Sequence, residues 1–91
     1  MKQLRMTKSA VDLLNTLPPK HHKPVVTQLF RLLSVPYPTD SKKLTGYKEL
    51  MRVNCGEYRI IYRVEEETVN VPLIGKWNDN EIYKLLERLN F

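Results

Sequence analysis

The first third of the chain has the spacing of two amphipathic helices. Residues 1–6 alternate weakly and predict a short strand, after which Thr7 can cap a helix. Pro18 and Pro19 end that helix, and a second helix begins among residues 18–23, where Pro24 is tolerated only within the first turn. We expect these helices to form a hairpin with one apolar side, made of Ala10, Leu13, Leu14 and Leu17 on the first helix and Val26, Leu29, Phe30 and Leu33 on the second.

From Tyr47 onward the period of the apolar residues changes to two. Segments 47–54, 57–64 and 68–75 read as strands, and the short turns at 55–56 and 65–67 make them antiparallel. Pro72 lies inside the third strand and predicts an edge position or a bulge there. The proline-rich segment 34–46 is expected to be a surface connection that carries Lys42 and Lys43.

The chain ends with a short amphipathic helix. Asn78 or Asp79 can cap it, and its apolar side comprises Ile82, Leu85, Leu86 and Leu89. The whole chain, 1–91, therefore predicts one α+β domain. Its helices are expected to pack on one face of a small antiparallel sheet of about four strands, with an N-terminal helical hairpin and a short C-terminal helix that closes the domain.

Charge and composition narrow the class of partner. The 91 residues include 15 Lys and Arg against 10 Asp and Glu, a net charge of +5. This excess favours nucleic acid, an anionic membrane or an acidic protein, although a solvated lysine surface is the plainer alternative. Cys55 is the single cysteine, and no segment has the apolar length of a signal peptide core or a membrane span, so we expect a cytoplasmic protein without membrane contact.

No cofactor or metal is expected from the residue pattern. The adjacent His21 and His22 have no Cys or His partners at ligand spacing.

The segment GEYRIIYR, residues 56–63, places two cations on one face of a strand. Alternation puts Arg59 and Arg63 on the side of Ile61, and the hairpin can bring Arg52 close to Arg59, with Lys76 at the end of the third strand. Such a cluster is tolerated when a polyanion binds it. The alternative is a solvated or salt-bridged face that uses the nearby glutamates 49, 57 and 65–67.

Three segments in order carry a family resemblance. After the two helices come LTGY (44–47), GEYRIIYRVEEETVNV (56–71) and IGKWNDNEIYKLL (74–86), and over nearly the whole chain this order resembles the RelE/ParE superfamily of type II toxin–antitoxin toxins. RelE-like members are ribosome-dependent endoribonucleases that cut mRNA, and ParE-like members poison DNA gyrase. The resemblance implies a cognate acidic antitoxin, the ribosome and mRNA as partners, and a toxin–antitoxin hetero-oligomer.

The resemblance also implies roles for individual residues. Arg59 falls on the arginine taken to bind the scissile phosphate, Arg52 on the basic residue of the preceding strand, and Tyr83 on the tyrosine of the last helix, so these three are the expected catalytic residues. RNA-binding roles are expected for Lys42, Lys43, Arg63, Lys76 and Trp77.

Two positions depart from the family pattern. Trp77 stands where the family has a second catalytic arginine or histidine, and Leu50 stands where it has another basic residue. Trp77 has three open interpretations: an aromatic packed against the last helix, a platform that stacks on a base, or a sign of weakened activity.

The leading functional hypothesis is a RelE-like mRNA endoribonuclease that inhibits translation. Cleavage by the RNA's own 2′-OH needs proton transfer and stabilisation of a charged phosphorane, and fixed arginines can supply the latter without a metal. The alternative is a ParE-like or catalytically weakened toxin that acts by binding protein. A DNA-binding corepressor ranks third, because no helix carries basic residues arranged for a major groove.

Overall fold

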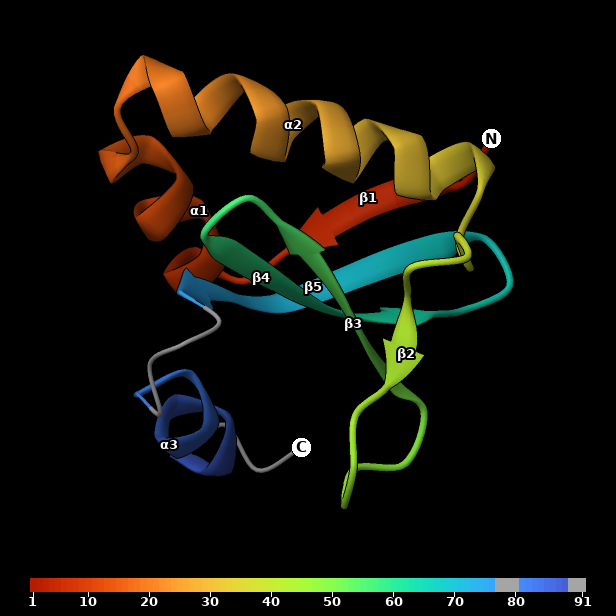
Figure 1. Ribbon diagram of the computed structural model, residues 1–91. Helices are drawn as coiled ribbons and strands as arrows, with labels where there is room; N and C mark the ends of the chain where they lie inside the picture. Colours follow the sequence, from red (N-terminus) through yellow and green to blue (C-terminus); the bar gives the residue numbers. More distant parts are fainter. Residues whose placement is uncertain (77–80, 89–91) are drawn as a thin grey trace.

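The computed structural model describes residues 1–76 and 81–88, and it shows a sheet covered on both faces (Figure 1). The strand order across the sheet is β1-β5-β4-β3-β2. In chain order the elements are β1 (Gln3–Met6), α1 (Lys8–Thr16), α2 (Pro19–Ser34), β2 (Lys42–Lys43), β3 (Leu50–Cys55), β4 (Tyr58–Val64), β5 (Thr68–Lys76) and α3 (Glu81–Arg88).

The sheet has five strands and is mixed, so the prediction of about four antiparallel strands was incomplete. β1 pairs with β5 in parallel, whereas the other neighbours are antiparallel. A parallel neighbour is possible because two helices and three strands lie between β1 and β5 in the sequence. β2 lies in the expected loop and pairs with β3; its two residues are too few to show a period.

Thr7 fixes the start of α1 as predicted. Its Oγ1 accepts a hydrogen bond from the Ala10 backbone N–H (3.2 Å) and donates one to the Pro72 carbonyl (2.6 Å). α1 packs mainly against β5 and only slightly against α2. Contact between the two helices is therefore slight, whereas the sequence predicted a helical hairpin packed on the sheet.

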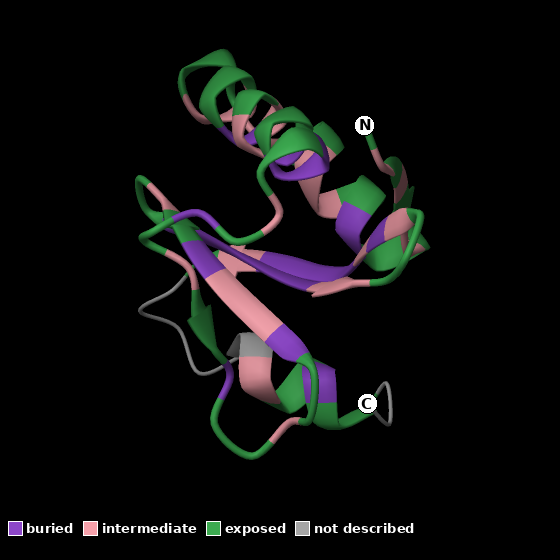
Figure 2. Cartoon of the chain, turned by 90° about the vertical axis from the view of Figure 1, so that its right-hand side faces the viewer, coloured by how far each residue is buried: buried purple, intermediate pink, exposed green. Residues whose placement is uncertain are grey.

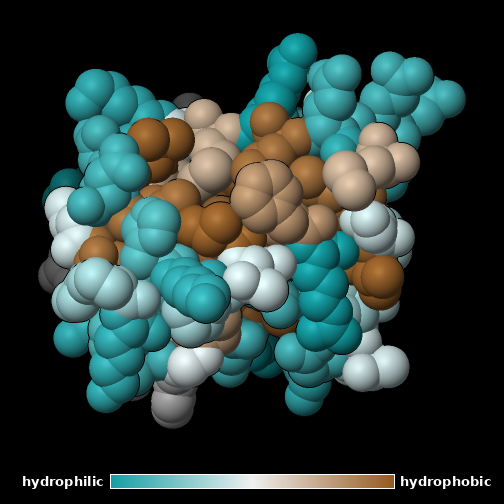
Figure 3. All heavy atoms as spheres, turned by 90° about the horizontal axis from the view of Figure 1, so that it is seen from above, coloured by the Kyte–Doolittle hydropathy of each residue, from teal (hydrophilic) through white to brown (hydrophobic). Residues whose placement is uncertain are grey.

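The buried side of α2 is rotated from the predicted one. Val25, Leu29, Leu32 and Leu33 are buried, whereas Phe30 is 59% exposed. Both sets have helical spacing, so the pattern alone does not choose between them. Figure 3 views the molecule from above, toward the outer side of this layer, and shows hydrophobic atoms gathered between hydrophilic ones.

Pro24 lies in the second turn of α2, beyond the first turn to which the prediction confined it. It cannot donate a backbone hydrogen bond to the Lys20 carbonyl. Both Lys20 and Pro24 are exposed, so water can satisfy that carbonyl.

Pro72 marks a bulge in a central strand. Ile61 pairs with Leu73 and Arg63 with Asn70, so two residues of β5, Val71 and Pro72, oppose one residue of β4. The predicted bulge is confirmed. The edge position is wrong, because β5 lies between β1 and β4.

Two apolar clusters lie on opposite faces of the sheet. The larger lies beneath α1 and α2 and includes Leu29, Ile60 and Tyr62. The smaller joins α3 to the other face through Leu44, Leu50, Ile61, Leu73 and Leu86. The prediction that all helices share one face was therefore wrong for α3, whose Leu86 packs on Ile61 and Leu73; Figure 2 shows the sheet between the two layers.

Candidate nucleic-acid interface

Strand β4 directs its arginines to the face that α3 covers. Tyr58, Ile60 and Tyr62 pack in the cluster beneath α1 and α2, and the alternate residues point the other way. The turn after β3 is tight, with Gly56 at φ 60°, and it sets the register in which Asn54 pairs with Arg59.

Arg59 is the buried charged residue of this face, only 9% exposed, although the sequence suggested an open position. Its Nε donates to Asn54 Oδ1 at 2.9 Å, and its Nη1 donates to the Tyr83 hydroxyl oxygen. Leu86 lies on the same side of α3 as Tyr83 and anchors the helix in the smaller cluster. The structure thus brings together Arg59 and Tyr83, two of the three residues that the resemblance implied to be catalytic.

The guanidinium of Arg59 has neutral hydrogen-bond partners. Among the side chains that the structure describes, those of residues 1–76 and 83–88, it makes no ion pair, and Asn54 and Tyr83, which are bonded to it, carry no charge. Burying a charge without an opposite charge costs free energy. A fold that accepts this cost holds a rigid cation ready for an anionic ligand.

Two further cations lie on this face. Arg52 pairs with Ile61, which places it diagonally from Arg59, and Lys42 on β2 pairs with Arg52. Paired residues in an antiparallel sheet point to the same side. β2 therefore adds Lys42 to this face of the sheet. The sequence predicted a loop at this position and did not show to which side Lys42 points.

Two other predicted RNA-binding lysines point to the opposite face. Lys43 pairs with Met51 and Lys76 pairs with Tyr58, and both partners pack in the cluster beneath α1 and α2. The expected cationic set is therefore divided between the two faces.

Arg63 shares the face of Arg59 but has a carboxylate partner. Its Nη2 donates to Glu65 Oε1 at 2.8 Å, and this hydrogen bond lowers the pKa of the Glu65 carboxyl. The salt-bridged interpretation of the arginine face is thus correct for Arg63.

Two more positions define the site. Leu50 is only 2% exposed and packs with Ile61, so at this position β3 offers an apolar side chain. Asn54 was not proposed as a functional residue, and only the strand register shows its contact with Arg59. Trp77 lies outside the described residues.

In the part of the chain that the structure describes, no three His, Cys, Asp or Glu side chains are grouped so that they could hold a metal ion. The described helices include none with the length and apolarity to cross a bilayer.

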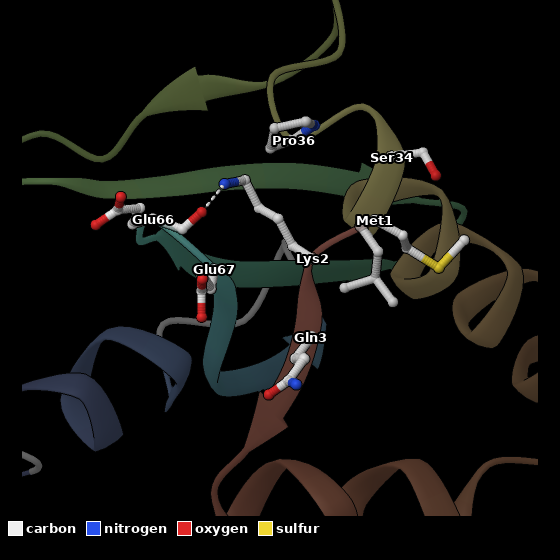
Figure 4. Close-up of a pocket in the computed structure, with 8 residues that line it drawn as sticks. Met1, Lys2, Gln3, Ser34, Pro36, Glu66 and Glu67 are labelled. Atoms are coloured by element: carbon white, nitrogen blue, oxygen red, sulfur yellow. Dashed lines mark hydrogen bonds between the residues drawn. The ribbon is translucent and has the colours of Figure 1, made fainter.

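A separate hollow lies where the N-terminus meets the β4–β5 turn (Figure 4). Lys2 Nζ donates to the backbone carbonyls of Glu65 and Glu66, which ties the first residues to that turn. None of the residues that line this hollow was predicted as a site residue: Met1, Lys2, Gln3, Leu33, Ser34, Pro36, Glu66 and Glu67.

Solved structures of similar fold include RelE toxins, alone and in complex with antitoxins. The archaeal RelE–RelB complex from Pyrococcus horikoshii OT3 is 26% identical with a TM-score of 0.72, over 82% of this chain and 93% of that chain. The RelBE2 toxin–antitoxin complex of Mycobacterium tuberculosis is 26% identical with a TM-score of 0.69, over 82% and 96%. The isolated E. coli RelE toxin is 21% identical with a TM-score of 0.74, over 100% of both chains. No family model and no curated protein matches the sequence. The likeness confirms the resemblance seen in the sequence and shows that the chain has a RelE-like toxin fold.

Proposed function

We propose that this chain, which has a RelE-like toxin fold, is the toxin of a type II toxin–antitoxin pair and inhibits translation by cleaving mRNA in the ribosome. The observation that carries the proposal is the Arg59 side chain, buried to 9% exposure and held by Asn54 and Tyr83 without a carboxylate partner among the described residues.

The free donors of Arg59 suit a phosphate. A guanidinium has five N–H donors. Asn54 and Tyr83 take one donor each from Nε and Nη1, which leaves one on Nη1 and both on Nη2. These three can bind two oxygens of a phosphate and stabilise the additional negative charge of the phosphorane when the 2′-OH attacks.

Neighbouring residues support this role. Arg52 and Lys42 lie on the same face and can bind the phosphates that flank the cleaved bond. Tyr83 positions Arg59 through its hydroxyl. The reaction also needs a base to accept the 2′-OH proton and an acid to protonate the 5′-oxygen. Trp77 belongs to the proposed RNA contacts.

The proposal includes an antitoxin. The complexes from P. horikoshii and M. tuberculosis pair such a toxin with RelB or its relative. A partner that covers Arg59 and the other cations of a chain with net charge +5 is expected to be acidic, and the resulting hetero-oligomer would hold the toxin inactive in the cytoplasm.

Controlled induction in cells tests the cleavage. Wild-type chain should arrest growth and produce new 5′ ends in translated transcripts by primer extension, while Arg59→Ala should do neither. Arg31→Ala is the matched control, because Arg31 is exposed on α2, across the sheet from Arg59. Equal cleavage by folded Arg59→Ala would refute the assignment.

Leu50 favours a second candidate, a toxin that acts by protein binding. Its burial gives the site one cation fewer than the family pattern implies. Growth arrest with intact transcripts and loss of DNA supercoiling would support a gyrase poison.

A further inference from the structure

A second hollow lies at the edge of the sheet, between the chain that follows α2 and the β2–β3 connection. Its volume is ≈ 710 Å³, within the range of roughly 300–1,000 Å³ typical of small-molecule sites. We call it the Tyr37 pocket. It is lined by Tyr37, Lys43, Leu44, Thr45, Tyr47, Lys48, Glu49, Met51 and Val64.

The Tyr37 pocket combines aromatic walls with an apolar floor. Tyr37 is 60% exposed, so most of its surface is accessible to a ligand. Tyr47 is half-buried against the cluster that contains Leu86 and Tyr83. Exposed aromatic rings beside a basic surface are the usual platform for bases of single-stranded nucleic acid.

The charges at the rim favour a polyanion. Lys43 and Lys48 are both exposed, and Glu49 is the single carboxylate among the lining residues. Two ammonium groups at one rim can bind a backbone phosphate, while the glutamate can accept a hydrogen bond from a base.

The connection that forms the pocket has a fixed shape. The Leu44 N–H donates to the Leu50 carbonyl at 2.9 Å and closes the loop. Gly46 has φ 86° and Glu49 has φ 67°, a left-handed conformation that costs free energy for a residue with a side chain. The pocket is therefore preformed, with Glu49 strained at its rim.

The edge strand links the pocket to Arg59. Lys42 points to the face of Arg59 and the next residue, Lys43, points into the pocket. Met51 lines the pocket from the face opposite to Arg59, and Asn54, the partner of Arg59, is roughly 10 Å further along β3. An RNA strand therefore reaches both by passing around β2 at the edge of the sheet. A few nucleotides of extended single-stranded RNA span such a distance.

We propose that the Tyr37 pocket binds a nucleotide of single-stranded RNA close to the cleaved bond. The base stacks on Tyr37 with Tyr47 as the second wall, and its phosphate lies between Lys43 and Lys48. The inference rests on the proposed function, because both take RNA as the substrate. It adds an RNA contact outside the cleavage residues.

Binding can be measured without cleavage. The Arg59→Ala chain is titrated into a fluorescein-labelled RNA oligonucleotide at several salt concentrations, and anisotropy gives the affinity. In this background Tyr37→Ala should weaken binding about tenfold, as expected for loss of one stacked base, and it should leave the salt dependence unchanged. Tyr37→Phe keeps the ring and should restore the affinity.

The contribution of the two pocket lysines is measured by the salt dependence of RNA binding. Replacing Lys43 and Lys48 together by alanine should reduce the slope of log K against log salt by about 0.7, the value for one phosphate contact on a single strand. Phe30→Ala is the control, since Phe30 is an exposed aromatic residue on α2, outside the pocket, and its loss should change neither quantity.

Photo-crosslinking identifies the source of the RNA. With 4-thiouridine in the mRNA of programmed ribosomes, a cross-link to residues 35–48 assigns the pocket to mRNA, and the absence of any cross-link at these residues would contradict that assignment. Unchanged RNA affinity in Tyr37→Ala, or loss of affinity for a protein antitoxin alone, would overturn the proposal. Tyr37-dependent RNA binding with no cleavage by the wild-type chain would refute the proposed function. It would still support RNA binding in the Tyr37 pocket.

Discussion

Replacing Arg59 with methionine should abolish cleavage and at the same time raise the stability of the protein. Methionine is similar in length to arginine and apolar, so it fills the site beside Asn54 and Tyr83 without a buried charge. The expectation follows from the 9% exposure of Arg59 and from its neutral partners.

The magnitude can be worked from these contacts. The two hydrogen bonds from the charged guanidinium contribute about 1.5–3 kcal/mol each. The desolvation penalty of a buried ion is several kcal/mol, which nearly cancels them. The exposed Asn54 side chain can hydrogen-bond to water once the guanidinium is removed, and methionine adds buried apolar surface. We therefore expect the free energy of unfolding to rise by about 1 kcal/mol, which corresponds to about 4–8 °C in Tm for a domain of this size.

Urea unfolding followed by circular dichroism measures the stability, and cleavage on programmed ribosomes measures the activity. The activity of Arg59→Met should fall at least 10²–10³-fold, as on removal of a donor that stabilises transition-state charge (order of magnitude). Arg31→Met is the control, since changes at exposed positions are usually within about 0.5 kcal/mol. A fall of about 2 kcal/mol or more in Arg59→Met would show that the guanidinium is a structural group and would refute the reasoning.

Three further predictions concern the surroundings of the site. Tyr83→Phe removes the hydroxyl oxygen that accepts from Arg59, so kcat on programmed ribosomes should fall about tenfold with KM unchanged; an unaltered kcat would contradict the positioning role. Thr7→Ala loses the α1 cap and should lower the free energy of unfolding by about 1–2 kcal/mol in urea without affecting cleavage, while Thr7→Ser should behave as wild type. Because the pKa of Glu65 is lowered from its ordinary 4.5, its contribution to stability is present above that pH and is lost as pH falls through the lower folded value. Wild type should therefore be more stable than Glu65→Gln at neutral pH, and a urea midpoint difference that persists in strong acid would be inconsistent with this linkage.

Sequence patterns predicted those features that depend on neighbours in the chain. The alternation in β4 placed Arg59 and Ile61 on one face, and Thr7 correctly marked the start of α1. The resemblance placed Tyr83 near Arg59, and the two side chains are in contact.

Features that depend on packing were not available from the sequence. The pattern of α3 shows that the helix needs an apolar surface, but Ile60 and Ile61 offer one on each face of the sheet. Alternation gives the face of Arg59 and says nothing of what covers it, which is why its burial was missed. Lys42 and Lys43 were placed correctly along the chain, but only strand pairing shows that they point to opposite faces.

The chemistry of the RNA ends tests the central claim most directly. Purified chain is incubated with mRNA on ribosomes and with the same mRNA alone, and the products are analysed by mass spectrometry. If Arg59 holds the scissile phosphate during attack by the 2′-OH, wild-type chain should give 2′,3′-cyclic phosphate and 5′-hydroxyl ends only on ribosomes, and Arg59→Ala should give none. Intact mRNA with the wild-type chain, or products that carry 5′-phosphate ends, would contradict the account.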